Sequence, residues 1–329
     1  NIVGLTGVMH DLVADGNSVV LVDHDTQILG EADWLIEMGP GAGADGGHVI
    51  ARGTKAALGA DPNSKIGPFL AGRQVQVRWR AEKDALFDLG RIHLATGAIH
   101  TVRPLEVDLP KGRLTVVTGV SGSGKTTLIL ESLIPGLQAA IAGQKLPGHV
   151  RAVTAPGIGQ VKLIDATPIG INVRSTVATY AGVHDELRKI FARSPAAKAL
   201  GYKAGDFSYN TGRLRCPTCD GTGVISLDVQ FLPDVDIPCP DCRGARYARD
   251  AAQVRIANKA GRELSLPDLM AMDVHTALDA CRDWKLVRQR LQVLDGLGLG
   301  YLTLGEETPS LSGGEAQRLK LASEMGKAQ

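Results

Sequence analysis

The sequence predicts an α/β protein interrupted by a small cysteine-rich module. Short apolar segments typical of buried strands alternate with stretches whose apolar residues recur at helical spacing. A glycine-rich loop, residues 119–126, lies between one such apolar segment and a helical stretch. Four of the five cysteines form two Cys-x-x-Cys pairs in a region whose apolar residues follow neither the helical nor the strand pattern. Together these observations indicate α/β units, one of which carries an insertion.

The composition fits a chain with more than one folded unit. Its 329 residues exceed the usual size of one compact domain, so we expect two or three units. The net charge of +1 neither supports nor excludes nucleic acid, because a binding face can be basic while the whole chain is neutral. No apolar stretch approaches the length needed to cross a bilayer, and the N-terminus does not resemble a signal peptide. We therefore expect a cytoplasmic protein without a membrane partner.

The first α/β segment is predicted over residues 1–58. Residues 2–12 have apolar side chains at helical spacing, residues 19–22 predict a short buried strand, and residues 48–51 predict another strand. The first of these strands ends at Asp23-His24-Asp25, and a helix over residues 28–34 is predicted to follow. Residues 59–85 contain prolines and mixed polarity, which indicates a linker.

A second α/β unit begins at residue 86. Strands are predicted at residues 92–94, 105–107 and 114–117, and a helix over residues 127–132 follows the glycine-rich loop. Residues 194–255 are rich in Gly, Pro and Cys and predict an inserted module. We therefore divide this part into a core that carries the loop (residues 86–193), the insertion (194–255) and a truncated helical region (256–329).

The loop at residues 119–126, GVSGSGKT, matches the pattern G-x-x-x-x-G-K-[ST]. Glycines let successive backbone N–H groups curl around phosphate oxygens, and the following helix directs its positive end at the same anion. Lys125 would reach the β- and γ-phosphates of ATP, and the Thr126 hydroxyl would bind Mg²⁺. The alternative, a chance Gly/Ser turn, is disfavoured by the predicted strand before it and helix after it. The predicted nucleotide contacts are Gly119, Ser121, Gly122, Ser123, Gly124, Lys125, Thr126 and Thr127.

A second small-residue turn occurs at residues 311–318, LSGGEAQR. Ser312 is typical of a helix N-cap, and Gly313 and Gly314 leave backbone donors open to an anion. By itself this turn could be only a helix cap. Together with the phosphate loop it resembles the signature turn of ATP-binding cassette proteins, which closes over the γ-phosphate bound by an opposing cassette. The long separation of the two motifs fits an insertion between them.

Cys216, Cys219, Cys239 and Cys242 have the spacing C-x₂-C-x₁₉-C-x₂-C. Two such knuckles present four thiolates tetrahedrally, which predicts a closed structural Zn²⁺ site. A redox dithiol and two chance pairs are the alternatives, but a redox pair is normally single and lies at a helix start. Acidic and basic residues around the module are nearly balanced. A DNA-contacting face and a solvated surface of mixed sign therefore both remain open.

The combination of motifs resembles the UvrA family of DNA-repair ATPases. The resemblance covers nearly the whole chain, which looks like the end of a first ATP-binding cassette and most of a second cassette with a zinc-bearing insertion. Besides the motifs above, it rests on residues 39–47, 178–183, 201–203, 207–210, 231–235 and 298–301. The implied fold class is an α/β ATP-binding cassette, a P-loop NTPase, with an inserted zinc-binding module.

By this resemblance the parent protein is a twin-cassette ATPase that dimerises, recognises bulky lesions in duplex DNA and passes them to a UvrB-like partner in nucleotide excision repair. His24 occupies the position of the switch histidine, which senses the γ-phosphate in the site of the first cassette. Because cassettes pair head to tail, the Ser312 turn would face the same nucleotide. The implied cofactors are ATP, Mg²⁺ and Zn²⁺.

The chain also departs from the family pattern. Ala166 stands where the family has a Gln that links Mg²⁺ and the attacking water to the insertion. No acidic strand-end motif follows the signature helix within this sequence. We therefore expect the isolated chain to bind nucleotide but to hydrolyse it poorly. Three alternatives remain: a non-catalytic scaffold whose zinc module binds DNA or protein, a paralogue that protects a cell against DNA-binding drugs, and the ATPase of a membrane transporter.

Overall fold

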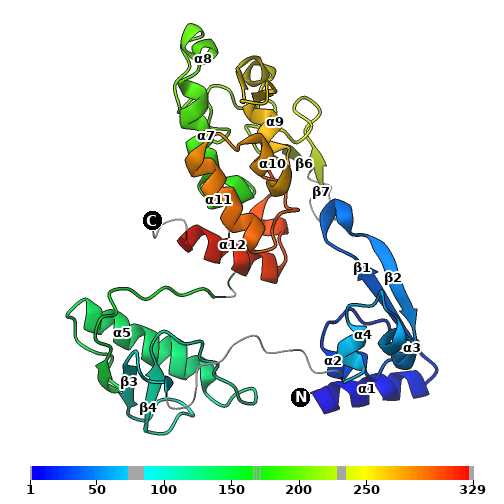
Figure 1. Ribbon diagram of the computed structural model, residues 1–329, viewed down its shortest axis with the longest axis vertical. Coiled ribbons are helices and arrows are strands. Elements are labelled where there is room, and N and C mark those ends of the chain that lie inside the picture. Colours follow the sequence, from blue (N-terminus) through cyan, green and yellow to red (C-terminus); the bar gives the residue numbers. More distant parts are fainter. Residues whose placement is uncertain are drawn as a thin grey trace. The chain divides into compact units, whose positions relative to one another are not determined.

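The computed structural model describes residues 2–72, 85–165, 167, 169, 172–227 and 235–325. The chain divides into two compact units, Asn1–Leu163 and Ile164–Gln329 (Figure 1). The first unit contains the glycine-rich loop, and the second contains the four paired cysteines and the signature turn. Residues 73–84 of the predicted linker lie outside the described residues.

The first part of the first unit is a small α/β body built on one hairpin. Helices α1 (Ile2–Ala14) and α2 (Thr26–Leu29) precede strands β1 (Leu35–Gly39) and β2 (His48–Gly53), which pair antiparallel on either side of the short turn η1 (Gly43–Asp45). Helices α3 (Lys55–Ala60) and α4 (Gly67–Leu70) follow. Four buried side chains form the core: Leu35, Ala51, Leu58 and Leu70. The opening helix and the strand at residues 48–51 are thus confirmed, and Leu70 joins this core although it lies in the predicted linker.

The helix predicted over residues 28–34 is shorter and begins earlier. The Asp25 carboxylate accepts from the Gln27 N–H at 2.8 Å and so caps α2. Gly30 follows the last helical residue. The cap, rather than the apolar spacing, therefore decides where this helix lies.

Residues 19–22 are not the buried strand that their apolar pattern predicts. They have no regular secondary structure, and Val20 and Val22 are 92% and 97% exposed. A strand satisfies its backbone N–H and C=O groups through a neighbouring strand, and no described strand pairs with this segment. Without such a neighbour, the apolar pattern is not sufficient to form a strand.

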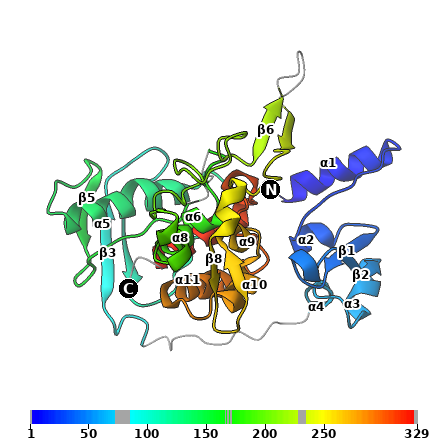
Figure 2. The same ribbon diagram turned by 90° about the horizontal axis from the view of Figure 1, so that it is seen from above.

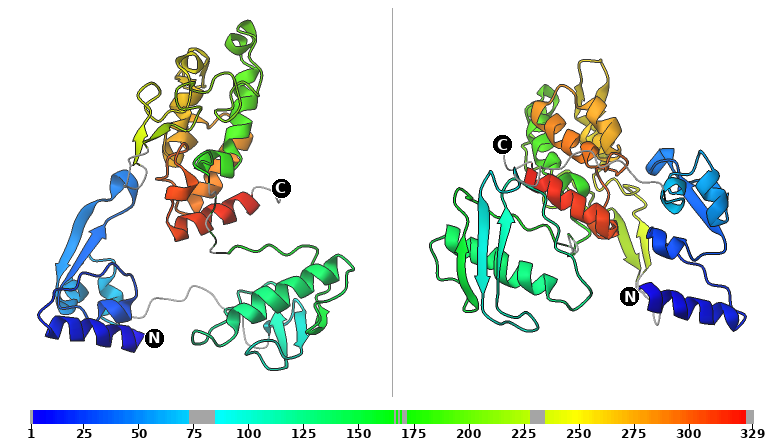
Figure 3. Two further views of the ribbon diagram at one scale, coloured as in Figure 1. Left: turned by 180° about the vertical axis from the view of Figure 1, so that it is seen from behind. Right: turned by 60° about the horizontal axis from the view of Figure 1, so that its bottom comes forward.

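The second part of the first unit is an antiparallel sheet covered by the helix that follows the glycine-rich loop. Strands β3 (Arg91–Thr96), β4 (Leu105–Pro110) and β5 (Val150–Thr154) have the order β4-β3-β5. This confirms the strands predicted at residues 92–94 and 105–107. The predicted helix begins as a π-helix, η3 (Thr127–Leu133), and continues as α5 (Ile134–Ile141) (Figure 3). Pro135 has no N–H to donate a helical hydrogen bond to the carbonyl four residues earlier. The wider π turns lie directly before this proline.

The strand predicted at residues 114–117 is also absent. This segment has no regular secondary structure, and Leu114 and Val116 are 94% and 77% exposed. As with residues 19–22, no described strand pairs with it. The helix after the loop is therefore present, whereas the strand expected before the loop is not.

The second unit is mainly helical. Two β-hairpins interrupt the helices: β6 (Val224–Leu227) with β7 (Val235–Pro238), and β8 (Arg255–Ala257) with β9 (Glu263–Ser265). The β6–β7 hairpin projects from the helical body (Figure 2). The helices and 3₁₀ turns are α6 (Val177–Tyr180), α7 (Val183–Ala192), α8 (Pro195–Ala199), η4 (Arg249–Gln253), α9 (Leu266–Met270), α10 (Val274–Ala280), α11 (Lys285–Gly296), η5 (Thr308–Ser310) and α12 (Gly313–Met325).

A hydrophobic core runs through this unit from Ile169 to Ala322. Leu187 and Phe191 lie one helical turn apart on α7, as Val287 and Leu291 do on α11, and all four are fully buried. The core joins residues from each of the three segments predicted between residues 86 and 329. The exact division of the chain into five segments stays a prediction.

A buried polar pair lies inside the same core. The Tyr247 hydroxyl donates to the Phe207 carbonyl oxygen at 2.9 Å and accepts from Nε2 of His184 at 2.7 Å. Burial, with a smaller contribution from the nearby Arg188 charge, lowers the pKa of His184 to about 3. Cys281, the cysteine outside the two pairs, is buried here, and burial raises its pKa to about 12.

Across the described residues, no helix is long and apolar enough to span a membrane.

Candidate functional site

The glycine-rich loop is exposed, and its backbone curls as the motif predicts. Gly119, Gly122 and Gly124 have φ values of 151°, 79° and 91°, which residues with a Cβ rarely adopt. Lys125 Nζ donates to the carbonyl oxygens of Gly119 and Val120, both at 2.8 Å. Its ammonium group therefore lies across the loop, where a phosphate oxygen would be a stronger, charged acceptor than a carbonyl.

Packing and helix geometry fix the end of the loop. A Cβ on Gly124 would lie 2.4 Å from Val102 Cγ2, so this position also excludes a side chain for lack of space. The Leu128 N–H donates to the Gly124 carbonyl at 2.8 Å, so the helix begins directly at the loop. Thr126 is exposed at this start, whereas the Thr127 hydroxyl donates to Glu131 at 3.1 Å. Of the two threonines, Thr126 is thus the one exposed at the start of the helix.

The signature turn begins α12 with a reciprocal cap. The Ser312 N–H donates to the Glu315 carboxylate at 2.7 Å, and the Glu315 N–H donates to the Ser312 hydroxyl at 3.4 Å. The backbone N–H groups of Gly313 and Gly314 are left at the positive end of the helix. The hydrogen bonds make Ser312 the cap of this helix, and the binding of an anion beside it stays a prediction.

Two residues that were not predicted from the sequence hold this turn in place. The Tyr301 hydroxyl donates to the Glu315 carboxylate. Arg318 donates to the carbonyl oxygens of Leu297 and Gly298 at 3.3 and 3.5 Å. Burial opposes ionisation of Glu315, but the hydrogen bonds from Tyr301 and Ser312 outweigh it and lower its pKa. Arg318 lies inside the motif, but no sequence signal pairs Tyr301 with Glu315.

The two signature glycines differ from the loop glycines in their backbone conformation. A Cβ built on Gly313 or Gly314 meets no atom within 4 Å, and neither residue has a positive φ. Nothing in the described chain therefore requires glycine at these positions. The missing side chains leave open space in front of the turn.

The segment around Ala166 is anchored to the signature helix. Lys320 of α12 donates to the Asp165 carboxylate and to the Thr167 hydroxyl, the latter at 2.8 Å. The hydrogen bond from Lys320, followed by that from Thr167, lowers the pKa of Asp165. Ala166 itself, where the sequence departs from the family pattern, lies outside the described residues.

The structure brings the four paired cysteines together. Their Sγ atoms all lie within 4.8 Å of one another, with 3.9 Å between Cys216 and Cys239 and 3.6 Å between Cys219 and Cys242. Four sulfurs around one tetrahedral zinc ion lie about 3.8 Å apart when each Zn–S bond is about 2.3 Å. The observed sulfur set therefore fits Zn²⁺ and lies too far apart for a disulfide.

The β6–β7 hairpin is what places the two knuckles side by side. Its strands pair from Val224 with Pro238, and the Cys239 N–H donates to the Gly223 carbonyl at 2.9 Å. Gly221 has a φ of 80°, and a Cβ there would lie 1.8 Å from the Tyr209 carbonyl oxygen. The Gly223 N–H donates to Cys219 Sγ at 3.3 Å. Burial opposes the Cys219 thiolate, but this and other donors lower its pKa to about 7, whereas burial raises the pKa of Cys242 to about 12.

His24 lies on the exposed loop before α2. Its backbone N–H donates to the Asp23 carboxylate at 2.6 Å. The backbone N–H groups of Asp25 and His24 lower the pKa of Asp23. The structure thus leaves the imidazole accessible, and its proposed sensing role stays a prediction.

Several basic residues around the cysteine module form ion pairs with carboxylates of the same chain. Three ion pairs account for them: Arg213 with Asp206 at 2.8 Å, Arg215 with Asp220 at 3.0 Å, and Arg246 with Glu307 at 2.7 Å. The third pair is buried, with only 4% of the Arg246 side chain exposed. The buried pair gives Arg246 a structural role, whereas Arg213 and Arg215 are 64% and 40% exposed and stay accessible from outside.

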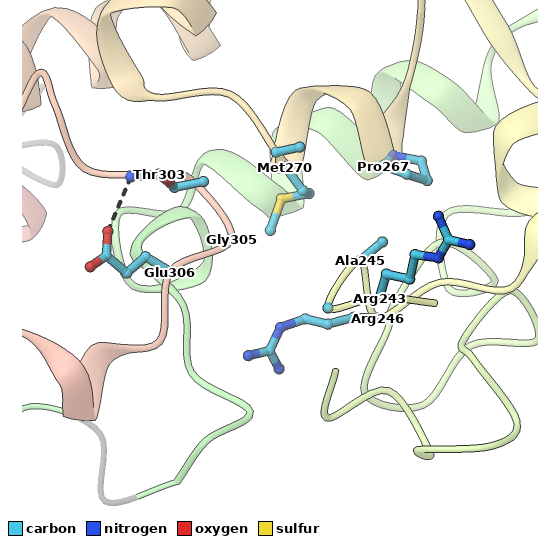
Figure 4. A pocket seen from close by; sticks show the side chains of 10 residues that line it. Arg243, Ala245, Arg246, Pro267, Met270, Thr303, Gly305 and Glu306 are labelled. Atoms are coloured by element: carbon cyan, nitrogen blue, oxygen red, sulfur yellow. Dashed lines mark hydrogen bonds between the residues drawn. The ribbon is translucent and has the colours of Figure 1, made fainter. Parts of the chain in front are cut away.

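A cavity of about 420 Å³ lies between the second cysteine knuckle and the loop ahead of the signature turn. Figure 4 shows Arg243 directed toward Pro267 and Arg246 directed toward the side where Thr303 and Glu306 lie. The apolar side chain of Met270 lines the cavity and is drawn between Thr303 and Pro267. The knuckle and the loop therefore line the same cavity from separate segments of the chain.

An exposed phosphate loop, a capped signature turn and a closed set of four thiols define an ATP-binding cassette that carries a cysteine module. The chain is 38% identical over 315 residues to UvrABC system protein A of Thermus thermophilus, an alignment covering 95% of this chain and 32% of that protein. It is 40% identical over 326 residues to UvrABC system protein A of Deinococcus radiodurans, covering 98% of this chain and 31% of that protein. The crystal structure of UvrA2 from Deinococcus radiodurans matches with a TM-score of 0.85 and 37% identity, over 98% of this chain and 38% of that chain. No protein-family model matches the chain.

The chain belongs to the UvrA family. It spans about a third of the length of the curated relatives it matches. The predicted fold class, an ATP-binding cassette with an inserted cysteine module, is confirmed by the match to UvrA2 and by the cysteine cluster.

Proposed function

We propose that this chain is part of an ATP-dependent protein that recognises DNA damage in nucleotide excision repair. The observation that carries the proposal is the signature turn, in which Gly313 and Gly314 are required by no contact inside the described chain. Glycine in open space permits close approach by something from outside, such as the phosphates of a nucleotide held on another cassette. The relatives, which are named UvrABC system protein A, support the same function.

In this proposal the loop at residues 119–126 binds ATP. Lys125 moves from the carbonyls of Gly119 and Val120 to the β- and γ-phosphates, and the exposed Thr126 hydroxyl binds Mg²⁺. The other proposed loop contacts donate through their backbones. His24 would sense the γ-phosphate on the first cassette and the Ser312 turn would approach that nucleotide from the opposite side. Because Ala166 replaces a glutamine, we propose that the chain alone hydrolyses ATP poorly.

The four cysteines are proposed to hold a structural Zn²⁺ ion. Bound zinc supplies a cross-link between the two knuckles, and no open coordination position remains for catalysis once four thiolates bind it. Gly221 and Gly223 allow the tight turns, and the Gly223 N–H supports the Cys219 thiolate. Zinc content and its loss on chelation test this part directly.

The proposed partners are damaged duplex DNA, a second copy of the parent protein and a UvrB-like repair protein, in the cytoplasm. The corresponding division is a first cassette over residues 1–58, a linker over 59–85, a second-cassette core over 86–193, a zinc insertion over 194–255 and a signature region over 256–329. Sections of the parent protein beyond this chain take part in these interactions.

The test is fluorescence anisotropy with a lesion-bearing duplex and its undamaged twin, titrated with the zinc-loaded chain at two salt concentrations. We expect tighter binding to the damaged duplex, weakened by salt and by zinc removal. Equal binding to both duplexes at either salt concentration would contradict damage recognition by this part of the protein. A parallel titration with a fluorescent ATP analogue tests nucleotide binding separately.

A second candidate is a scaffold that binds partners without turning over ATP. The exposed segment at residues 114–117 favours it, because the strand expected to support the phosphate loop is absent. Nucleotide binding without measurable hydrolysis, combined with DNA binding that ATP does not change, would favour the scaffold.

A further inference from the structure

The second cysteine knuckle holds Arg246 in a constrained position. Its φ is 67°, a left-handed conformation that is costly for a residue with a Cβ and persists only when the surroundings impose it. The Arg246 carbonyl accepts from the Cys216 N–H at 2.9 Å, and the Ala245 N–H donates to the Cys242 carbonyl at 2.9 Å. Both knuckles therefore set the backbone of Arg246, and it is placed correctly only when they are assembled.

The Arg246 side chain extends from the knuckle and contacts residues outside it. Its Nη2 atom lies 2.7 Å from the Glu307 carboxylate, and its guanidinium lies over the Tyr209 ring at 5.3 Å from the ring centre. A buried charge without its partner is strongly unfavourable, so the arginine and the carboxylate hold each other in place. Such a pair specifies position more than it adds stability.

Glu307 lies at the entrance to the signature turn. It forms an isolated bridge with Thr176, and its carbonyl accepts from the Ser310 hydroxyl at 2.7 Å. The short turn η5 then leads straight into Leu311 and Ser312. The backbone beside Glu307 is also held by the Val177 N–H, which donates to the Glu306 carbonyl, and by the Thr308 N–H, which donates to the Ser175 carbonyl, both at 2.9 Å. The contact with Arg246 therefore adds to these bonds in positioning the chain that leads to the signature glycines.

Few other connections join these two segments. The cavity of about 420 Å³ separates residues 243–246 from residues 303–306 (Figure 4). Within the described part of the chain, the Arg246–Glu307 pair is the ion pair that joins the second knuckle to the loop ahead of the signature turn. Asp220 of the first knuckle pairs with Arg174, but this pair is largely exposed and therefore weaker.

We propose that Arg246 and Glu307 are positioning residues that transmit the assembled state of the cysteine cluster to the signature turn. When the knuckles come apart, Arg246 loses its imposed conformation, Glu307 loses its partner, and the turn at residues 312–314 loses part of its support and opens more often. The proposal rests on the proposed zinc site and signature role, and it names the link between them.

The test measures hydrogen exchange of the peptide covering residues 311–318 in the zinc-loaded chain and after chelation. Chelation should raise exchange in the unaltered chain by about tenfold, the factor expected when a charge-assisted hydrogen bond that resists local opening is lost. Glu307→Gln, which keeps the side-chain shape, should show the raised exchange while zinc is still bound, and chelation should add little. Zinc content is measured in parallel by a colorimetric assay.

Asp185→Asn is the matched control, because it removes a carboxylate from an exposed ion pair with Arg188 on α7. It should behave like the unaltered chain. If zinc-loaded Glu307→Gln exchanges as slowly as the unaltered chain, the link is refuted. Loss of zinc from Glu307→Gln would also refute it, because the residue would then hold the module itself. Neither readout needs ATP or DNA, so a failure of nucleotide or DNA binding would leave this result intact.

Discussion

The phosphate loop and the cysteine cluster are both set by short sequence motifs, yet their surroundings differ. The cluster is enclosed: Cys216 and Cys239 are 1% and 0% exposed, and one hairpin of the same chain completes the ligand set. The phosphate loop is open, and the apolar segment before it, residues 114–117, has no strand partner among the described residues.

This difference shows what each kind of site needs. A structural metal site needs four sulfurs and two tight turns, which a local stretch of sequence can supply. A nucleotide site needs a loop held by a buried sheet and a second surface that approaches the phosphates. The cysteine cluster therefore reaches its final geometry within one unit, whereas the loop has its backbone conformation but not its expected support.

The largest effect should come from removing one thiol of the cysteine cluster. We expect Cys239→Ser to abolish stoichiometric zinc binding and to unfold the knuckles, because zinc sites of this class contribute about 10 kcal/mol of apparent binding free energy. Zinc analysis and a thermal unfolding scan measure both. Cys281→Ala, which alters the buried thiol outside the cluster, should retain zinc. Full zinc content in Cys239→Ser would show that the cluster is not the binding site.

The buried histidine should make the second unit sensitive to acid. In the unfolded chain His184 binds a proton below the ordinary histidine pKa of 6.5, while the folded chain resists protonation down to about 3. The unfolding free energy should therefore fall with decreasing pH across this window, by up to about 1.4 kcal/mol per pH unit. Urea denaturation at several pH values measures the slope. His184→Gln should flatten it, and an unchanged slope would mean that other groups cause the acid sensitivity.

Lys125→Ala tests whether the open loop still binds nucleotide. We expect affinity for a fluorescent ATP analogue to fall by roughly ten- to a hundredfold, as loss of a charge-assisted hydrogen bond predicts. Lys111→Ala removes a lysine elsewhere in the same unit, one that donates to the Pro156 carbonyl, and serves as control. Equal affinity in Lys125→Ala and the control would indicate that this loop does not bind phosphates.

Replacing a loop glycine by alanine should lower the free energy of unfolding more than replacing a signature glycine. Gly124→Ala should destabilise the first unit by about 1–3 kcal/mol, because its φ is strained for alanine and Val102 leaves no space. Gly313→Ala should change stability by less than about 1 kcal/mol, because the turn is open and alanine favours helix. Differential scanning calorimetry distinguishes them. A comparable loss in Gly313→Ala would mean that this glycine serves folding rather than recognition.

Much of the site could be predicted because its motifs are local. Glycines at fixed offsets, a serine before a helix and two Cys-x-x-Cys pairs each predict a local arrangement. The structure has a positive φ at Gly124, a cap hydrogen bond to Ser312 and a cluster of the four sulfurs, while their ligands stay predictions. The roles of Tyr301, Arg246 and Glu307 could not be predicted in this way. Their partners are remote in sequence, and no periodicity links an arginine after a knuckle to a glutamate before a turn.

The sequence by itself predicted the turns of the phosphate loop, the helix cap and the two cysteine knuckles, because short-range sterics and donor spacing act within a few residues. Only the tertiary structure decided which apolar segments become strands and which charges are buried. Residues 19–22 and 114–117 have the composition of strands but no described neighbour to bond, while Arg246 looks like a surface cation and is buried against Glu307. Strand formation and charge burial both depend on a partner brought close by the fold, which no local pattern encodes.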